Sequence, residues 1–185
     1  MRELQPGSIL WVSRWSDLHT AWARIEEARG NDQGAVANWW EAVVATGRVL
    51  ELAPSDRFAR AMEPRLLRSC GEVALRLGAW ARLLSVVERI VDRQGEEGPA
   101  LRVAGLFAAR AVASLDRSKA VPTGSGIDGD STGGQRAQFV QRAFSLLERA
   151  AQVGAYDRAA ATEGEELVGL RGEPGFSRWL AELPL

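Results

Sequence analysis

The sequence predicts an all-α protein, a short right-handed α-solenoid of antiparallel helix pairs closed by a C-terminal capping helix. Apolar residues recur at spacings of three and four along most of the chain, which is typical of amphipathic helices. Glycine, proline and capping residues separate these segments. The stretch 64–92 contains two short helical segments joined at Gly78, and neither can bury its apolar face alone, as in stacked repeats. We therefore expect one domain over 15–183, after an N-terminal segment 1–14.

The composition of the chain is typical of a globular domain. The chain has 185 residues, 46% apolar and 25% charged, which is enough for one sizeable core. Its net charge of −1 argues against binding nucleic acid or a membrane surface through bulk electrostatics. One cysteine excludes an internal disulfide. With no long apolar run and no secretory signal, a cytoplasmic location without a membrane span is expected.

The first predicted helix pair covers 15–53. Its first helix is expected to start at an N-cap formed by Ser16 or Asp17, after an apolar cluster at 9–12 that either docks on this pair or is loose. The expected core face of this helix is Trp15, Leu18, Trp22, Ile25 and Ala28. The run 30–34 is predicted to be a loop, followed by a second helix over 35–52.

The later pairs are expected at 64–93 and 99–152. A proline inside a helix costs about 3 kcal/mol, so Pro64 predicts a break between a short helix or turn at 56–62 and a helix at 64–77. Within the third pair, the Gly- and Ser-rich stretch 116–134 is predicted to be a flexible loop. Two capping helices, at 156–170 and 174–183, are expected to end the chain.

The stretch 64–92 resembles a tetratricopeptide repeat. Gly71 stands where the first helix of that repeat needs a small residue, Gly78 at the turn between helices, and Trp80 at the aromatic position after it. The ending VLELAPSD (49–56) is similar to the end of such a repeat, and Trp39 and Ala42 match its second helix. The resemblance implies a tetratricopeptide-like superhelix that binds proteins in a concave groove.

The C-terminal stretch resembles a tail found at the end of repeat arrays in planctomycete-type bacterial proteins. Its features are a Gly-Tyr turn, a short helix, a Leu-Arg step and a closing helix. The matching residues here are Gly154, Tyr156, Leu167, Leu170, Arg171, Pro174, Phe176, Leu180 and Leu183. The resemblance implies a place at the end of a larger signalling chain, for example one linked to a kinase.

Residues with chemical potential favour structural roles. His19 is the only histidine and has no partner ligands in the sequence, so neither a metal site nor a general base is favoured over a structural role. Cys70 is expected to be a buried small hydrophobe rather than a nucleophile. Asp128 and Asp130 lack the further ligands of a calcium loop. The acidic run Glu163, Glu165 and Glu166 is interpreted as a solvated helix face that pairs with Arg158 and Arg171.

These observations predict a non-enzymatic interaction module with no cofactor and no metal, because reacting groups do not converge anywhere. The expected partner is a protein or an acidic peptide, bound in a groove lined by the first helices of each pair. The Trp39-Trp40 pair either packs internally, which is favoured, or leaves one ring to anchor a partner. The alternative is a structural or regulatory C-terminal region of a larger signalling protein without its own ligand. The candidate partner-binding residues are Arg24, Glu27, Arg68, Glu72, Arg76, Arg102 and Arg110.

Overall fold

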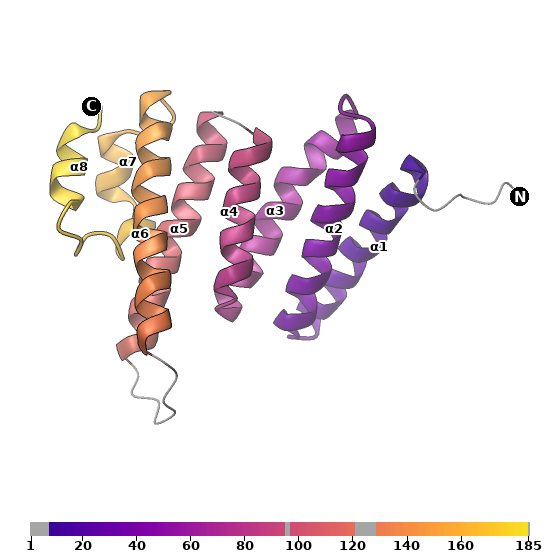
Figure 1. Cartoon of the computed structure of the whole chain (residues 1–185), viewed down its shortest axis with the longest axis horizontal. Helices are drawn as coiled ribbons and strands as arrows, with labels where there is room; N and C mark the ends of the chain where they lie inside the picture. The colour runs from indigo at the N-terminus through magenta and orange to yellow at the C-terminus, as the bar shows by residue number, and fades with distance from the viewer. Residues whose placement is uncertain (1–7, 95–96, 121–128, 185) are drawn as a thin grey trace, which may run out of the picture. The chain divides into compact units, whose positions relative to one another are not determined.

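The computed structural model describes residues 8–94, 97–120 and 129–184, with only the backbone for 94, 118–120 and 129–132. These residues form eight α-helices and one 3-10 helix, and contain no strand, which confirms the all-α prediction (Figure 1). The chain divides into two compact units, Met1–Ala79 and Trp80–Leu185. No helix in the described ranges has the length and apolar character that a membrane crossing requires. The helices are α1 (Ile9–Ala28), α2 (Asp32–Leu52), α3 (Arg57–Leu77), α4 (Trp80–Gln94), α5 (Gly98–Ala120), α6 (Gly129–Gln152), α7 (Arg158–Glu163), η1 (Glu165–Leu167) and α8 (Phe176–Glu182).

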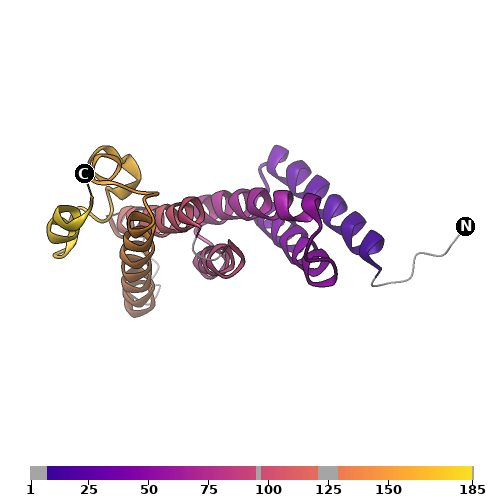
Figure 2. The ribbon, with the colours of Figure 1, turned by 90° about the horizontal axis from the view of Figure 1, so that it is seen from above.

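In the first unit, α2 packs against both α1 and α3, and α1 lies beside α2 at the edge of the unit (Figure 2). Each of these helices starts at a side-chain N-cap, which satisfies one backbone N–H of the first turn. Ser8 accepts from the amide of Trp11, Asn31 from Gly34 and Asp56 from Ala59. At the other end, α3 stops at Gly78, which has the left-handed φ of 71° that a glycine C-cap adopts.

Two predicted boundaries in this unit were wrong. The first helix begins at Ile9, and its N-cap is Ser8 and not Ser16 or Asp17, which lie eight and nine residues further along the chain. The cluster 9–12 is therefore the first turn of α1, while residues 1–7 lie outside the described residues. The predicted loop 30–34 is shorter than expected, since Asn31 caps α2 and residues 32–34 are helical.

The predicted break at Pro64 was also wrong, because α3 continues through it. Apolar residues on both sides of the proline are buried, Ala59 before it and Leu66 and Leu67 after it. α3 packs against α2, and this burial offsets the lost backbone hydrogen bond, which costs about 3 kcal/mol in an isolated helix. Tertiary burial thus outweighs the local preference.

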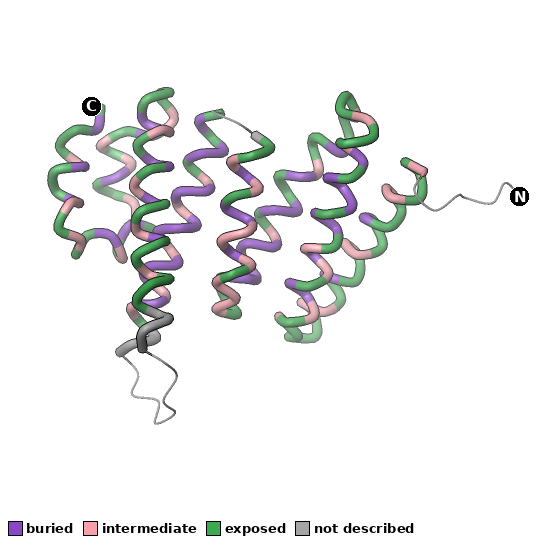
Figure 3. The backbone as a smooth tube through the Cα atoms, viewed as in Figure 1, coloured by how far each residue is buried: buried purple, intermediate pink, exposed green. Residues whose placement is uncertain are grey.

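In the second unit, α5 packs against α4, α6 and η1. Figure 3 shows buried positions along most of α5, and Leu101, Phe107 and Leu115 are among its buried side chains. The C-terminal elements complete this core with Tyr156, Leu167, Leu170, Phe176, Trp179 and Leu183, all of which are buried. In and beside the last helix, Phe176, Trp179 and Leu183 are buried and Leu180 is half-buried.

The predicted loop 116–134 is helical at both ends, because α5 extends to Ala120 and α6 starts at Gly129. An ion pair between Arg136 and Asp116, with the shorter N–O distance 2.6 Å, joins the two helices near this point. Residues 121–128 lie outside the described residues. The predicted helix over 156–170 is interrupted at Gly164, so that it forms α7 and η1.

The predicted pair 64–93 has its first helix in one unit and its second in the other, and each unit is described by itself. Within each unit, helices adjacent in sequence pack against one another. Antiparallel pairing, solenoid stacking and a single repeat domain over 15–183 stay predictions.

Candidate functional site

The most unusual surface of the described chain is an exposed apolar row on α1. Five large residues repeat with spacings of four and three, and each has between 41% and 46% of its surface exposed. We call this row the α1 stripe. It consists of Trp11, Trp15, Leu18, Trp22 and Ile25.

The local structure explains why the large residues of α1 face outward. The face of α1 toward α2 carries small residues, and Ser16 and Ala23 are its only buried positions. Ser16 Oγ donates to the carbonyl of Ala42 at 3.2 Å and lies 2.7 Å from Thr46 Oγ1. Small residues with satisfied hydroxyls let two helices approach closely, which leaves the wide residues on the opposite face. The predicted core face of this helix was therefore wrong, since it is the exposed face.

The aromatic rings of the stripe are ordered relative to one another. Trp11 and Trp15 stack with centroids 6.1 Å apart, and Trp15 meets the edge of His19 at 4.7 Å. His19 Nδ1 lies 2.8 Å from Asn38 Oδ1 on α2, and its Nε2 is buried without a hydrogen-bond partner. His19 thus contacts both Trp15 of the stripe and Asn38 of α2, which agrees with the structural role predicted for it.

Two hollows adjoin the N-terminal half of α1, and of these two the smaller is bordered by stripe residues. One has a volume of about 390 Å³ and lies between α1, the end of α2 and the start of α3, with Leu10, Phe58 and Met62 in its wall. The other has a volume of about 280 Å³ and lies beside Trp11 and Trp15. Both are large enough to accept an aliphatic or aromatic side chain from another molecule.

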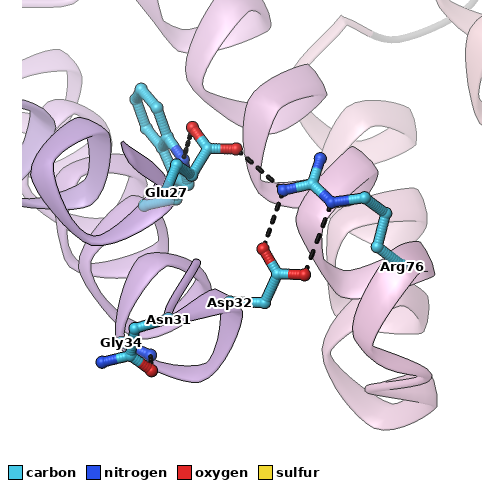
Figure 4. Close-up of polar contacts among 6 residues, drawn as sticks. Glu27, Asn31, Asp32, Gly34 and Arg76 are labelled. Carbon is cyan, nitrogen blue, oxygen red and sulfur yellow. Dashed lines mark hydrogen bonds and ion pairs between the residues drawn. The ribbon is translucent and has the colours of Figure 1, made fainter. Parts of the chain in front are cut away.

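A polar cluster lies at the opposite end of α1. The Arg76 guanidinium donates to Asp32 Oδ1 at 2.9 Å and to Glu27 Oε1 at 3.0 Å (Figure 4). The indole N–H of Trp39 donates to the other oxygen of Glu27 at 3.2 Å. The hydrogen bond from Arg76 lowers the pKa of Asp32, and the hydrogen bonds to Asp32 and Glu27 raise the pKa of Arg76, so Asp32 and Arg76 stay ionised at neutral pH.

The predicted partner-binding residues are only partly brought together. Glu27 and Arg76 form the polar cluster just described, whereas Arg24 and Arg68 are exposed and Glu72 is half-buried elsewhere in the first unit. The other two belong to the second unit. There, the guanidinium of Arg102 lies 5.6 Å from the Tyr156 ring centre and that of Arg110 lies 5.9 Å from the Phe107 ring centre.

The other candidates occupy structural positions. Cys70 is buried, with Sγ 3.9 Å from the carbonyl of Val36, which confirms the expected burial. Trp39 is buried and Trp40 is half-buried, so the pair packs internally. Arg158 and Arg171 donate to backbone carbonyls, not to the acidic run as predicted.

Two further observations concern the possible metal ligands. Among the side chains that the structure describes, no group of three His, Cys, Asp or Glu is placed to hold a metal ion. Asp128 lies outside the described residues, as does the side chain of Asp130.

Sequence reasoning missed the α1 stripe as a surface, although a signal was present. The spacing 4-3-4-3 from Trp11 to Ile25 has a period of 3.5, which is typical of a helix that pairs along a seam. The small residues Ser16 and Ala23 on the other face indicate which side packs internally.

The sequence matches no family model, and neither a curated protein nor a solved structure matches it.

Proposed function

We propose that this chain is a non-enzymatic protein–protein interaction module that binds an amphipathic helix along the α1 stripe. The observation that carries the proposal is the exposure of five large apolar residues in one continuous row. Exposed apolar patches of more than a few hundred Å² on soluble proteins mark interaction sites. Tryptophan is also among the residues that contribute most to binding free energy.

A helix is the partner class that fits this surface best. The stripe runs along a straight helix of 20 residues, and its spacing matches the knobs-into-holes packing of two helices. The hollow beside Trp11 and Trp15 can take a side chain that projects from a bound helix. A partner helix would cover apolar surface on α1 and fill this hollow at once.

The arginine-lined groove supports this function less well. An acidic peptide would have to displace Glu27 and Asp32 from Arg76, and these contacts are already charge-assisted. Arg102 and Arg110 belong to the other unit. The sequential packing of neighbouring helices within each unit supports a solenoid of antiparallel pairs as the scaffold, and we retain it as part of the proposal.

The test is binding of a dye-labelled amphipathic peptide of about three heptads with leucine at the seam positions, followed by fluorescence anisotropy. Kept at nanomolar concentration, the peptide is too dilute to self-associate. We expect binding in the micromolar range for the unmodified chain, and affinity lower by about 10-fold or more for the double variant Trp15→Glu, Trp22→Glu.

The matched control is the double variant Val153→Glu, Val168→Glu. It places the same charges on exposed apolar positions of the second unit, and we expect it to bind as the unmodified chain does. Circular dichroism checks that all variants stay helical. Equal peptide binding by both double variants would contradict the proposal, as would a complete lack of binding by the unmodified chain.

A further inference from the structure

We infer that the helix which covers the α1 stripe is α1 of a second copy of this chain, in a two-fold α1–α1 seam. This inference rests on the proposed function, because it names the occupant of the same surface.

The spacing makes the stripe complementary to itself. Trp11, Trp15, Leu18, Trp22 and Ile25 follow the alternation of four and three that both helices of a coiled-coil seam require. A two-fold axis brings identical surfaces together, so a single helix with this spacing supplies both sides of the seam. In a parallel pair each stripe residue, including Leu18 in the middle, meets its own counterpart, and this is the arrangement that we infer.

Every residue of the stripe is exposed over 41% to 46% of its surface. Ser16 and Ala23, the buried residues of α1, lie on the side toward α2, whereas Trp11 and Trp15 border α2 through the smaller hollow. Packing on α2 and the contact between Asn38 and His19 hold α1 in its helical form. A second α1 would therefore dock on a preformed helix, with little ordering cost to offset.

The exposed area reaches what a specific dimer needs. From the exposed fractions, the five residues present on the order of 500 Å² per copy, because a buried tryptophan side chain alone covers about 200 Å². Two copies would then bury on the order of 1,000 Å², which is the lower limit for a specific interface. Interfaces of this size belong mostly to weak, transient complexes, and we therefore expect a dissociation constant in the micromolar range.

Charge does not oppose self-association. The net charge of the chain is −1, so two copies experience almost no long-range repulsion. The stripe itself contains no charged side chain. Arg14, Asp17 and Arg24 lie exposed on the same helix and carry both signs, which leaves no single-sign field beside the seam.

The experiment is sedimentation velocity of the full chain from about 1 to 200 µM, a range that brackets the expected affinity. We expect the mass to rise with concentration from 20.1 kDa toward twice that value. The variant Trp15→Glu, Trp22→Glu should stay monomeric throughout, and Val153→Glu, Val168→Glu should dimerise like the unmodified chain. Circular dichroism confirms that both variants are folded.

A cross-link locates the seam independently. Leu18→Cys should form a disulfide-linked dimer under mild oxidation, because the two Leu18 positions face each other across a parallel seam. Val168→Cys, on an exposed position of the second unit, should not. The native Cys70 is buried and does not compete.

Four outcomes separate this inference from the proposed function. Dimerisation that is lost in the tryptophan double variant, together with the Leu18→Cys cross-link, supports the inference. A chain that stays monomeric at 200 µM but still binds the labelled peptide overturns the inference and leaves the proposed function in place. A dimer that persists in the folded tryptophan variant places the interface elsewhere and also overturns it. Monomers that bind no peptide overturn both.

Discussion

Helices α1 and α5 are similar in length and rich in apolar residues, yet they use those residues in opposite ways. In α5 the large side chains Leu101, Phe107 and Leu115 are buried, because α4, α6 and η1 cover the helix within the second unit. In α1 the tryptophans are exposed and only Ser16 and Ala23 are buried. An apolar helix face therefore indicates that the helix packs against another surface, but it does not indicate whether that surface belongs to the same unit.

The difference between α1 and α5 can be tested most directly by truncating one large side chain in each helix. Phe107→Ala removes a side chain that is 3% exposed, and we expect it to lower the free energy of unfolding by about 3–5 kcal/mol. Trp22→Ala removes one that is 45% exposed, and we expect a change of about 0.5 kcal/mol or less. Urea unfolding at low protein concentration measures both. Similar losses in the two variants would show that the stripe is part of the internal core.

A smaller effect sharpens the description of α5 as a covered helix. Gly169 follows η1, and a Cβ built on it would lie 2.7 Å from Ala113 Cα and 2.9 Å from its Cβ. Since backbone atoms cannot yield easily, we expect Gly169→Ala to cost about 1–3 kcal/mol of stability by urea unfolding. Gly172→Ala is the matched control, because no atom lies within 4 Å of the added methyl. Equal stability of the two variants would contradict the close approach to α5.

The smallest expected effect concerns the pKa of Tyr156, which lies in the second unit with α5. Burial raises the pKa of Tyr156 to about 12, although the nearby Arg102 charge opposes the shift. Because the folded pKa exceeds the ordinary value of 10.0, burial of the neutral phenol contributes stability in full below pH 10, and this contribution is lost as the pH rises through about 12.

Tyr156 is the only tyrosine in the chain, so ultraviolet absorbance of the phenolate reports on it alone. We expect its titration to lie well above that of the urea-unfolded chain, which provides the reference. A midpoint near 10 while circular dichroism remains helical would show that the ring is open to water.

Much of the helical framework could be predicted from local signals. Gly78 ends α3, α2 lies close to the predicted helix 35–52, and α8 lies within the predicted capping helix 174–183. These predictions succeeded because caps, glycine conformations and period 3.6 act within a few residues. Ser8 was missed as a cap, because the polar residues at 16 and 17 offered an equally plausible start.

The candidate site was harder to predict, because which face of a helix is buried depends on its neighbours. Spacing placed Trp15, Leu18, Trp22 and Ile25 on one face, and the expectation that this face forms the core was the ordinary one. The close approach of α1 to α2 through Ser16 reversed it. Similarly, Glu27 and Arg76 were predicted as free groove residues, but folding joins them across 49 positions of sequence.

The sequence by itself determined the fold class, most helix positions and the period of the α1 stripe, because each depends on interactions between residues a few positions apart. Only the tertiary structure decided that α3 continues through Pro64, that the stripe faces outward and that Arg76 is held by Glu27 and Asp32. Those features depend on which surfaces meet in three dimensions, and burial there outweighs local preference by a few kcal/mol.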